Sequence, residues 1–385
     1  MNKNDSKDKN KKISIKHRPV AREDIFSDKD KEPQVSKNLY LTPKKKKLPP
    51  WLLPLIIIAV LLLGVFVLLP SLLTDSNDEN PSATEQPQAT EPVIPLAGVG
   101  DRAVLKRSSA LVFTRADKTS PHITELLLNE SVLITDTAQK DWLGVELEDG
   151  LSGYVERSAL TADTSSLSLD DDVVMKLVIR DPFKRVMSHA RGGTLLLEAP
   201  MGTILYADYH NSGLVRVKLP EGKLGWMNTQ GVFLLNVNED LPVPDDFQKS
   251  FIFTAIAFEN AAYIPGGQTR NGISTAGVVR LSALLNGLEL PRTAGQLMEV
   301  GEKVEFPKTS AQPAIKFLRP GDLVFFHEKA DDQSLDLMAL CLTEERLLLS
   351  LNNKATIQII DFDSVTAEEL SERIMVARRL NESSQ

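Results

Sequence analysis

The strongest constraint on this chain is the stretch from Trp51 to Leu73, which contains no charged residue and consists mostly of Leu, Ile and Val. At a rise of about 1.5 Å per residue, a helix of this length matches the roughly 30 Å hydrocarbon core of a bilayer. A helix of this length in a globular core normally carries a polar face, and this stretch has none. The sequence therefore predicts one membrane-spanning helix over residues 51–73.

The charge on the two sides of this stretch has opposite signs. Residues 1–50 hold 15 Lys and Arg against 7 Asp and Glu, a net charge of +8, whereas the other 335 residues hold 29 against 45, a net of −16. Basic residues beside a spanning helix stay on the cytoplasmic side. We therefore expect residues 1–50 to be a disordered, basic cytoplasmic tail, with the bulk of the chain outside.

A cleaved signal peptide is the alternative to a permanent anchor. Its basic region would be unusually long, and no small-x-small cleavage site directly follows Leu73. Residues 74–97 are rich in Pro, Ser, Thr, Glu and Gln, which predicts a flexible linker. Cys341 is the single cysteine, so no intramolecular disulfide stabilises the outer part.

An internal repeat appears in two segments whose starts are 72 residues apart. Residues 145–155 read VELEDGLSGYV, and residues 217–227 read VKLPEGKLGWM. Each contains an acidic residue followed by Gly, at Gly150 and Gly222, and Gly supplies the positive φ that a tight hairpin turn needs. The repeat predicts two β-hairpins within a region of short apolar runs.

This repeated pattern resembles the end of bacterial SH3-like domains, where a hairpin is followed by Gly-Trp or Gly-Tyr. The resemblance implies two small SH3-like β-barrels, at residues 98–162 and 172–237, that bind cell-wall peptides or glycan. The alternative for each aromatic residue is that it packs in an ordinary core. The aromatic positions concerned are Trp142, Tyr154 and Trp226.

From about residue 246 the pattern changes to mixed helix and strand. Residues 263–279 read YIPGGQTRNGISTAGVV, residues 290–296 read LPRTAGQ, and residues 318–326 read LRPGDLVFF. In this order and spacing the strings resemble the NlpC-type cell-wall peptidases, papain-like cysteine enzymes that cut the stem peptides of peptidoglycan. The resemblance implies an α+β papain-like domain over residues 246–385. It also implies a bacterial cytoplasmic (inner) membrane location, with the C-terminal domains periplasmic or extracytoplasmic.

The chemistry of that family needs a thiolate at a helix N-terminus, an imidazole base and a third polar group that orients the base. Carried over position by position, the nucleophile motif places Ser274 where the family has Asp and Thr275 where it has the catalytic Cys. The position of the base falls on Leu337, and the third polar position falls near Ser350. These vestigial positions predict a pseudoenzyme.

The alternative is a peptidoglycan stem-peptide endopeptidase with relocated catalytic residues. A register slip of one residue would place Asp336 at the base position, and Cys341 would be a displaced nucleophile, although it lies in an apolar strand that suits a small buried hydrophobe. His327 would lie beside Leu337 in an antiparallel hairpin, which makes a pair with Thr275 conceivable. Five His without a His or Cys partner at ligand spacing predict no metal site, and we expect no cofactor.

The sequence thus predicts a membrane-anchored, non-catalytic envelope protein. Its partners would be peptidoglycan or its stem peptides, or an envelope protein of the cell-wall or division machinery. Tyr263, Gln268 and Arg292 are candidate binding residues near the cleft, with packing as the alternative for Tyr263 and capping contacts for the other two. The acidic outer part has no P-loop and no basic patch laced with aromatic residues, so we expect no nucleic-acid partner.

Overall fold

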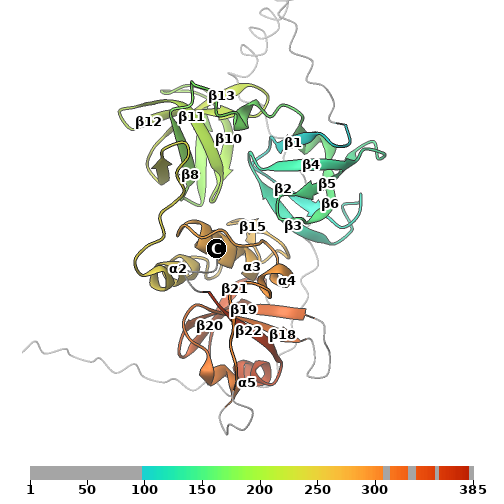
Figure 1. The fold of residues 1–385 in the computed structure, drawn as a ribbon, viewed down its shortest axis with the longest axis vertical. Coiled ribbons are helices and arrows are strands. Elements are labelled where there is room, and N and C mark those ends of the chain that lie inside the picture. Colours follow the sequence, from blue (N-terminus) through green and yellow to red (C-terminus); the bar gives the residue numbers. More distant parts are fainter. Residues whose placement is uncertain (1–97, 307–312, 328–334, 352–354, 381–385) are drawn as a thin grey trace, which may run out of the picture. The chain divides into compact units, whose positions relative to one another are not determined.

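The computed structural model describes residues 98–306, 313–327, 335–351 and 355–380, which are mostly β-structure with some helices (Figure 1). The predicted tail (1–50), spanning helix (51–73) and linker (74–97) lie outside the described residues. Within the described part, no helix combines the length and the apolar character needed to cross a bilayer.

The first β unit is an antiparallel sheet of seven short strands (Figure 1). Its strand order is β3-β2-β6-β5-β4-β1-β7. Alternate residues point into one core, as in β4, where Val132 and Ile134 are buried and Leu133 between them is exposed. The strands are β1 (Arg102–Leu105), β2 (Ser109–Phe113), β3 (His122–Leu127), β4 (Ser131–Asp136), β5 (Trp142–Leu147), β6 (Ser152–Glu156) and β7 (Leu160–Thr161), with the 3-10 turn η1 (Arg157–Ala159) before β7.

The second β unit repeats this arrangement strand for strand. Its order, β10-β9-β13-β12-β11-β8-β14, is that of the first unit with every strand number raised by seven. A separate apolar core fills it. The strands are β8 (Met175–Ile179), β9 (Phe183–Met187), β10 (Leu195–Pro200), β11 (Ile204–Asn211), β12 (Leu214–Leu219), β13 (Lys223–Asn228) and β14 (Val232–Leu235), preceded by the 3-10 turn η2 (Ser165–Leu167).

The two hairpins predicted from the internal repeat are confirmed, and their registers agree. Val145 pairs with Gly153 between β5 and β6, and Val217 pairs with Gly225 between β12 and β13. Because a one-residue slip would reverse every side chain, the same register places equivalent residues on equivalent faces. The structure shows two β units of one topology; their assignment to SH3-like domains stays a prediction.

The turns of these hairpins use the left-handed backbone that the sequence led us to expect. Gly150 has φ of 80°, and in the second hairpin both Glu221 and Gly222 are left-handed, at 67° and 65°. Two successive residues with positive φ are typical of the turns that match the twist of a hairpin.

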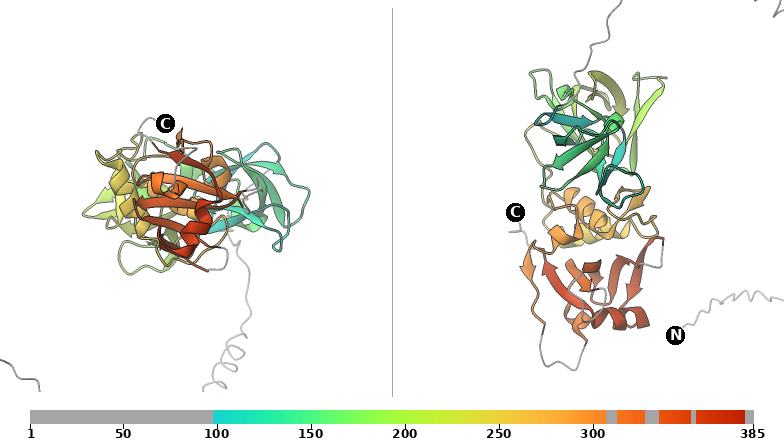
Figure 2. Two further views of the ribbon diagram at one scale, coloured as in Figure 1. Left: turned by 90° about the horizontal axis from the view of Figure 1, so that it is seen from below. Right: turned by 90° about the vertical axis from the view of Figure 1, so that its right-hand side faces the viewer.

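The C-terminal unit packs helices against a six-stranded antiparallel sheet of order β17-β22-β18-β19-β20-β21 (Figures 1 and 2). A small two-stranded sheet precedes the helix α3. The elements are α2 (Phe247–Ile256), β15 (Gln268–Thr269), β16 (Gly272–Ile273), α3 (Thr275–Leu284), α4 (Ala294–Leu297), β17 (Glu302–Lys303), η3 (Ala314–Phe317), β18 (Asp322–His327), β19 (Leu335–Thr343), β20 (Arg346–Ser350), β21 (Ile357–Asp361), α5 (Val365–Ser371) and β22 (Ile374–Arg379).

Both faces of this sheet are covered, which explains the continuous apolar run in β18. Leu323 and Phe325 point into the core shared with α2 and α3, whereas Val324 and Phe326 point into the core shared with α5. A strand buried on both faces does not alternate between apolar and polar residues. The string LVFF is therefore a consequence of packing on two sides.

Three consecutive leucines at the end of β3 connect the three units, with Leu126 and Leu127 in the strand and Leu128 directly after it. Leu126 lies in the core of the first β unit, Leu127 in the core of the C-terminal unit, and Leu128 in the core of the second β unit. All three side chains are at most 1% exposed. The segment therefore holds the three units against one another through hydrophobic burial.

Candidate functional site

The position that the sequence assigned to the lost nucleophile lies at the N-terminus of α3. Ser274 caps this helix: its Oγ accepts a hydrogen bond from Gly277 N at 3.0 Å. Thr275 is the first helical residue and is only 6% exposed. Its Oγ1 accepts a hydrogen bond from Ser350 N at 3.1 Å, so the hydroxyl oxygen is tied to β20.

The four vestigial positions line a single cavity of about 190 Å³. Ser274 and Thr275 lie on one side, Leu337 comes from β19, and Ser350 ends β20. Tyr263 and Arg292 line the same cavity, and Ile123 of the first β unit, Leu335 and Met338 add apolar surface. The structure thus brings together residues that are up to 227 positions apart in the chain, from Ile123 to Ser350.

None of the described residues that line this cavity is a His, Cys, Asp or Glu. A threonine hydroxyl acts as a nucleophile only beside a base strong enough to take its proton. The wall that β19 provides consists of Leu335, Leu337 and Met338, which have no proton acceptor. The side chain of Asp336, the alternative base position, lies outside the described residues.

The pairing of β18 with β19 differs from the expectation for His327. His327 pairs with Leu335, and Phe326 pairs with Leu337, because the register shifts at a bulge between Phe326 and His327. His327 is not among the residues that line the cavity with Thr275. Its Nδ1 is buried without a hydrogen-bond partner among the described residues.

Cys341, the other candidate for a relocated nucleophile, is fully buried in the core beneath α5. Burial raises the pKa of its thiol to about 12. Its Sγ is directed at Thr343 O, 3.1 Å away within β19. The thiol is therefore protonated at physiological pH and lies away from the cavity.

We expect Cys341 to be inert toward iodoacetamide at pH 8 in the folded protein and to react fully after denaturation in urea. The reason is that alkylation needs an accessible thiolate, and burial removes both the access and the charge. Mass spectrometry of the alkylated chain measures the outcome. Labelling of the native chain at a rate close to that of free cysteine would contradict the burial of this thiol.

Arg292 is held by the first β unit. Its Nη1 donates to Glu130 Oε2 at 3.0 Å, and its Nε donates to Asp149 Oδ2 at 2.9 Å. Arg280 of α3 also pairs with Glu130, at 3.1 Å. The side chains of Arg292 and Arg280 are 9% and 15% exposed. The sequence indicates Arg292 but not Glu130, because residues more than 160 positions apart leave no local pattern.

Burial and charged neighbours act in opposite directions on the pKa values of the residues in this cluster. Burial opposes the charge of Glu130, but Arg292 and Arg280 outweigh it and hold the pKa of this carboxyl below its ordinary value. Burial likewise opposes the charge of Arg292, but Glu130 and Asp149 outweigh it and raise its pKa. For Arg280 burial dominates and lowers the pKa. The ion pairs of this cluster link α3 to the first β unit.

Gln268 does not itself line the cavity, but it contacts Arg292, which does. It is fully buried, and its backbone N donates to Glu125 Oε2 at 2.8 Å. Its Nε2 donates to Arg292 O at 3.3 Å. Gln268 therefore contributes to the contact between the C-terminal and first β units.

The acidic turn residue of each repeated hairpin makes a contact with a neighbouring unit. Asp149 of the first unit pairs with Arg292 of the C-terminal unit at 2.9 Å, and Glu221 of the second unit pairs with Lys106 of the first at 2.6 Å. Hydrogen bonds from Lys106 and then Lys223 lower the pKa of Glu221. The repeat therefore has a structural use that the sequence alone did not show.

The three predicted aromatic positions are half-buried and make ring contacts. Trp142 packs edge-on against Phe113, with ring centroids 5.3 Å apart. Trp226 packs edge-on against Tyr209 at 5.5 Å, with the Arg216 guanidinium 5.7 Å from its centroid. The hydroxyl of Tyr154 donates to Asp136 Oδ2 at 3.4 Å. These residues are thus neither fully core nor fully free.

The described ranges contain no group of three or more His, Cys, Asp or Glu side chains that is arranged to hold a metal ion.

Comparison with known proteins defines the C-terminal unit. Residues 260–379 match the profile of the NlpC/P60 family. The chain therefore carries an NlpC/P60 family domain at its C-terminal end. Sequence analysis placed the resemblance over nearly the same stretch.

Other similarities cover more of the chain than this domain does. Dipeptidyl-peptidase 6 from Lysinibacillus sphaericus is 24% identical over 231 residues, which cover 58% of this chain and 81% of that protein. The crystal structure of an NlpC/P60 family protein from Bacillus cereus ATCC 10987 is similar over 72% of this chain and 99% of its own, at 20% identity and a TM-score of 0.61. The structure of an NlpC/P60 endopeptidase from Photobacterium damselae subsp. piscicida is similar over 74% of this chain and 72% of its own, at 13% identity and a TM-score of 0.50.

Proposed function

We propose that this chain is a membrane-anchored pseudoenzyme of the cell envelope. In this proposal the NlpC/P60 domain and the two β units, read as SH3-like domains, bind peptidoglycan or an envelope protein without cleaving either. The observation that carries the proposal is the apolar wall of Leu335, Leu337 and Met338 in the cavity that holds Thr275. Without a proton acceptor there, the hydroxyl has no means of activation.

The cavity nevertheless retains features of a binding site. Ser350 Oγ is buried and has no hydrogen-bond partner among the described residues, although Ser350 lines the cavity. A buried polar atom without a partner costs free energy, so a bound polar group would offset that cost. The apolar wall opposite suits the aliphatic parts of a peptide.

The second candidate is a stem-peptide endopeptidase that uses relocated residues. It draws support from the similarity to a dipeptidyl-peptidase over 231 residues. The geometry of the described residues gives this candidate little support. Cys341 is buried in another core, and His327 does not line the cavity of Thr275. We therefore prefer the non-catalytic proposal.

Incubation of the full chain, purified in mild detergent, with purified sacculi distinguishes the two. We expect no release of muropeptides above the background of buffer alone, because no described residue that lines the cavity is a His, Cys, Asp or Glu that could act as a base. Chromatography with mass spectrometry measures the products, and an active NlpC/P60 hydrolase run in parallel shows that the sacculi are a competent substrate. Release that the Thr275→Ala substitution abolishes would overturn the pseudoenzyme proposal.

Co-sedimentation of the same preparation with sacculi tests binding separately from catalysis. Recovery of the chain in the pellet supports wall binding, whereas its absence favours a protein partner. The Ala276→Phe substitution places a bulky side chain in the cavity. It is expected to reduce sedimentation several-fold if the NlpC/P60 domain is the part of the chain that binds the sacculi. Unchanged sedimentation would assign wall binding to the β units.

A further inference from the structure

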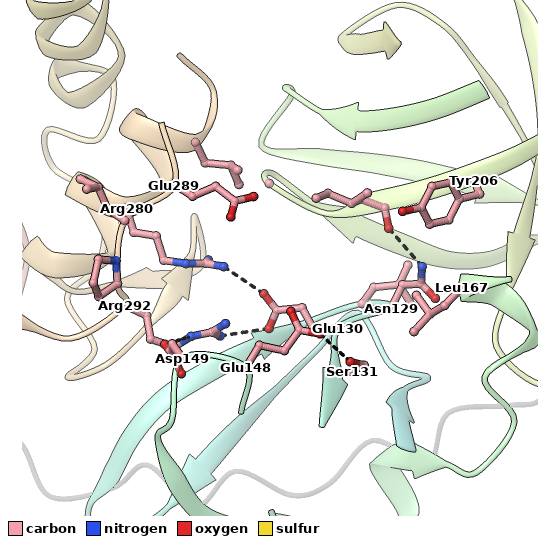
Figure 3. Close-up of a pocket in the computed structure, with 16 residues that line it drawn as sticks. Asn129, Glu130, Ser131, Glu148, Asp149, Leu167, Tyr206, Arg280, Glu289 and Arg292 are labelled. Carbon is pink, nitrogen blue, oxygen red and sulfur yellow. Dashed lines mark hydrogen bonds and ion pairs between the residues drawn. The ribbon is translucent and has the colours of Figure 1, made fainter. Parts of the chain in front are cut away.

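A second, larger cavity lies where the two β units and the C-terminal unit meet, and it shares only Arg292 with the cavity of Thr275. Its volume is about 490 Å³, within the range of small-molecule sites (Figure 3). The first β unit contributes Asn129, the second contributes Tyr206, and the loop after α3 contributes Glu289. The site therefore exists only when all three units are assembled.

The lining of this cavity is acidic once its internal ion pairs are considered. Glu130 and Asp149 are occupied by Arg280 and Arg292. Glu148 and Glu289 remain as additional carboxylates. Glu148 accepts a hydrogen bond from Ser131 Oγ at 2.8 Å and forms a long, exposed ion pair with Arg102 at 3.6 Å. Glu289 has no ion-pair partner among the described residues. The cavity thus carries two negative charges beyond those that its own arginines neutralise.

Neutral hydrogen-bond acceptors accompany these charges. Asn129 is only 4% exposed; its Nδ2 donates to Ile204 O at 3.2 Å, while its Oδ1 is buried without a partner in the described part of the chain. In Figure 3 the carboxylate of Glu289 and the hydroxyl of Tyr206 point toward the same space from opposite sides. An unsatisfied buried acceptor favours a ligand that donates hydrogen bonds.

The rest of the lining is aliphatic. Leu128, Leu284 and Leu290 come from three different segments, and Leu128 and Leu290 are buried. Such surface suits a methylene stem, which long basic side chains bury while their charged group reaches polar atoms. An ammonium group offers three donors for these acceptors, and its positive charge is opposite in sign to the charge excess.

We propose that this cavity binds a primary amine on an aliphatic stem, the chemistry of a lysine side chain. The ammonium group is held by Glu289, with Tyr206 and Asn129 as further acceptors, and the stem lies along the leucines. The proposal concerns a site other than the Thr275 cavity and holds whether or not the chain cleaves peptidoglycan. Because Glu289 is exposed, the amine enters from the solvent side.

Isothermal titration of the full chain in mild detergent tests the proposal with two probes that differ only in charge, aminopentanol and pentanediol. We expect the amine to bind and the diol not to bind. Glu289→Gln removes the charge with little change of shape and should weaken amine binding about tenfold or more. Tyr206→Phe should weaken it a few-fold. Glu198→Gln, an exposed glutamate on β10 outside this cavity, should leave it unchanged.

The outcomes decide the proposal in either direction. Equal binding of amine and diol, no amine binding at tens of millimolar, or amine binding that survives Glu289→Gln would each overturn it. Titration with Nα-acetyl-lysine amide then distinguishes the sources of the amine. Binding of this compound assigns the site to a lysine side chain of a peptide or protein, and its failure beside successful aminopentanol binding assigns the site to a free aliphatic amine.

Discussion

Replacing Glu130 by glutamine will lower the free energy of unfolding by about 3–5 kcal/mol, the cost of removing one partner from a buried ion-pair cluster. Glu130 is the common partner of Arg280 and Arg292, whose guanidinium groups are at most 15% exposed. After the substitution Arg292 keeps Asp149, but Arg280 keeps only a long contact to Gln268, at 3.5 Å. Urea denaturation followed by circular dichroism measures the loss.

The matched control for this substitution is Glu148→Gln, a nearby carboxylate that is 73% exposed. Its pair with Arg102 is a surface contact, and such pairs contribute little. We expect a change below about 0.5 kcal/mol. Equal effects of the two substitutions would show that Glu130 is solvated and that the cluster does not hold the units together.

The same cluster predicts a dependence of stability on pH. The pKa of Glu130 is lower in the folded chain than its ordinary value, so folding favours the ionised form. Its contribution is therefore complete above the unfolded pKa of about 4.3 and is lost as the pH falls through the lower folded value. The stability difference between the native chain and Glu130→Gln should be largest near pH 7 and shrink below about pH 4.

Replacing Asp322 by asparagine is the second substitution with a large expected effect, also about 3–5 kcal/mol. Asp322 is fully buried and binds Arg379 through two hydrogen bonds, from Nε at 2.8 Å and from Nη2 at 2.7 Å. It also accepts from Arg319 N at 2.8 Å. An asparagine offers one oxygen in place of two and leaves the guanidinium with an unpaired charge.

The control for Asp322 is Asp361→Asn, which also removes a carboxylate that pairs with an arginine across neighbouring strands. Asp361 and Arg346 are 61% and 58% exposed, so we expect a loss below about 1 kcal/mol. The two variants are compared by urea denaturation. A small effect at Asp322 would mean that the Asp of the string PGDLVFF is retained for a reason other than stability.

Much of the local structure was predictable from sequence because it depends on neighbouring residues. The hairpins at Gly150 and Gly222 follow from turn chemistry, and their common register follows from the repeat. The location of Thr275 at a helix N-terminus followed from resemblance to the nucleophile motif, and Ser274 is a residue type that caps helices.

The remainder of the site was not predictable because it depends on contacts between distant segments. Ile123, Leu335 and Met338 line the cavity of Thr275, but their pattern in the sequence is that of ordinary strand residues. The expectation for His327 was wrong about its neighbour: the register of β18 against β19 places Phe326 opposite Leu337, and a bulge after Phe326 then places His327 opposite Leu335. A bulge of one residue leaves no signal in an apolar run.

The chain by itself determined a charge-free stretch between a basic tail and an acidic outer part, and it determined the repeated hairpin. It also determined that Thr275 and Leu337 stand where the family resemblance implies Cys and His. Only the tertiary structure assigned Leu126, Leu127 and Leu128 to three different cores. Likewise, the ion pair between Arg292 and Glu130 is visible only in the folded structure. Hydrophobicity and charge are properties of a residue, whereas the core or partner that receives the residue depends on which surfaces the folded units bring together.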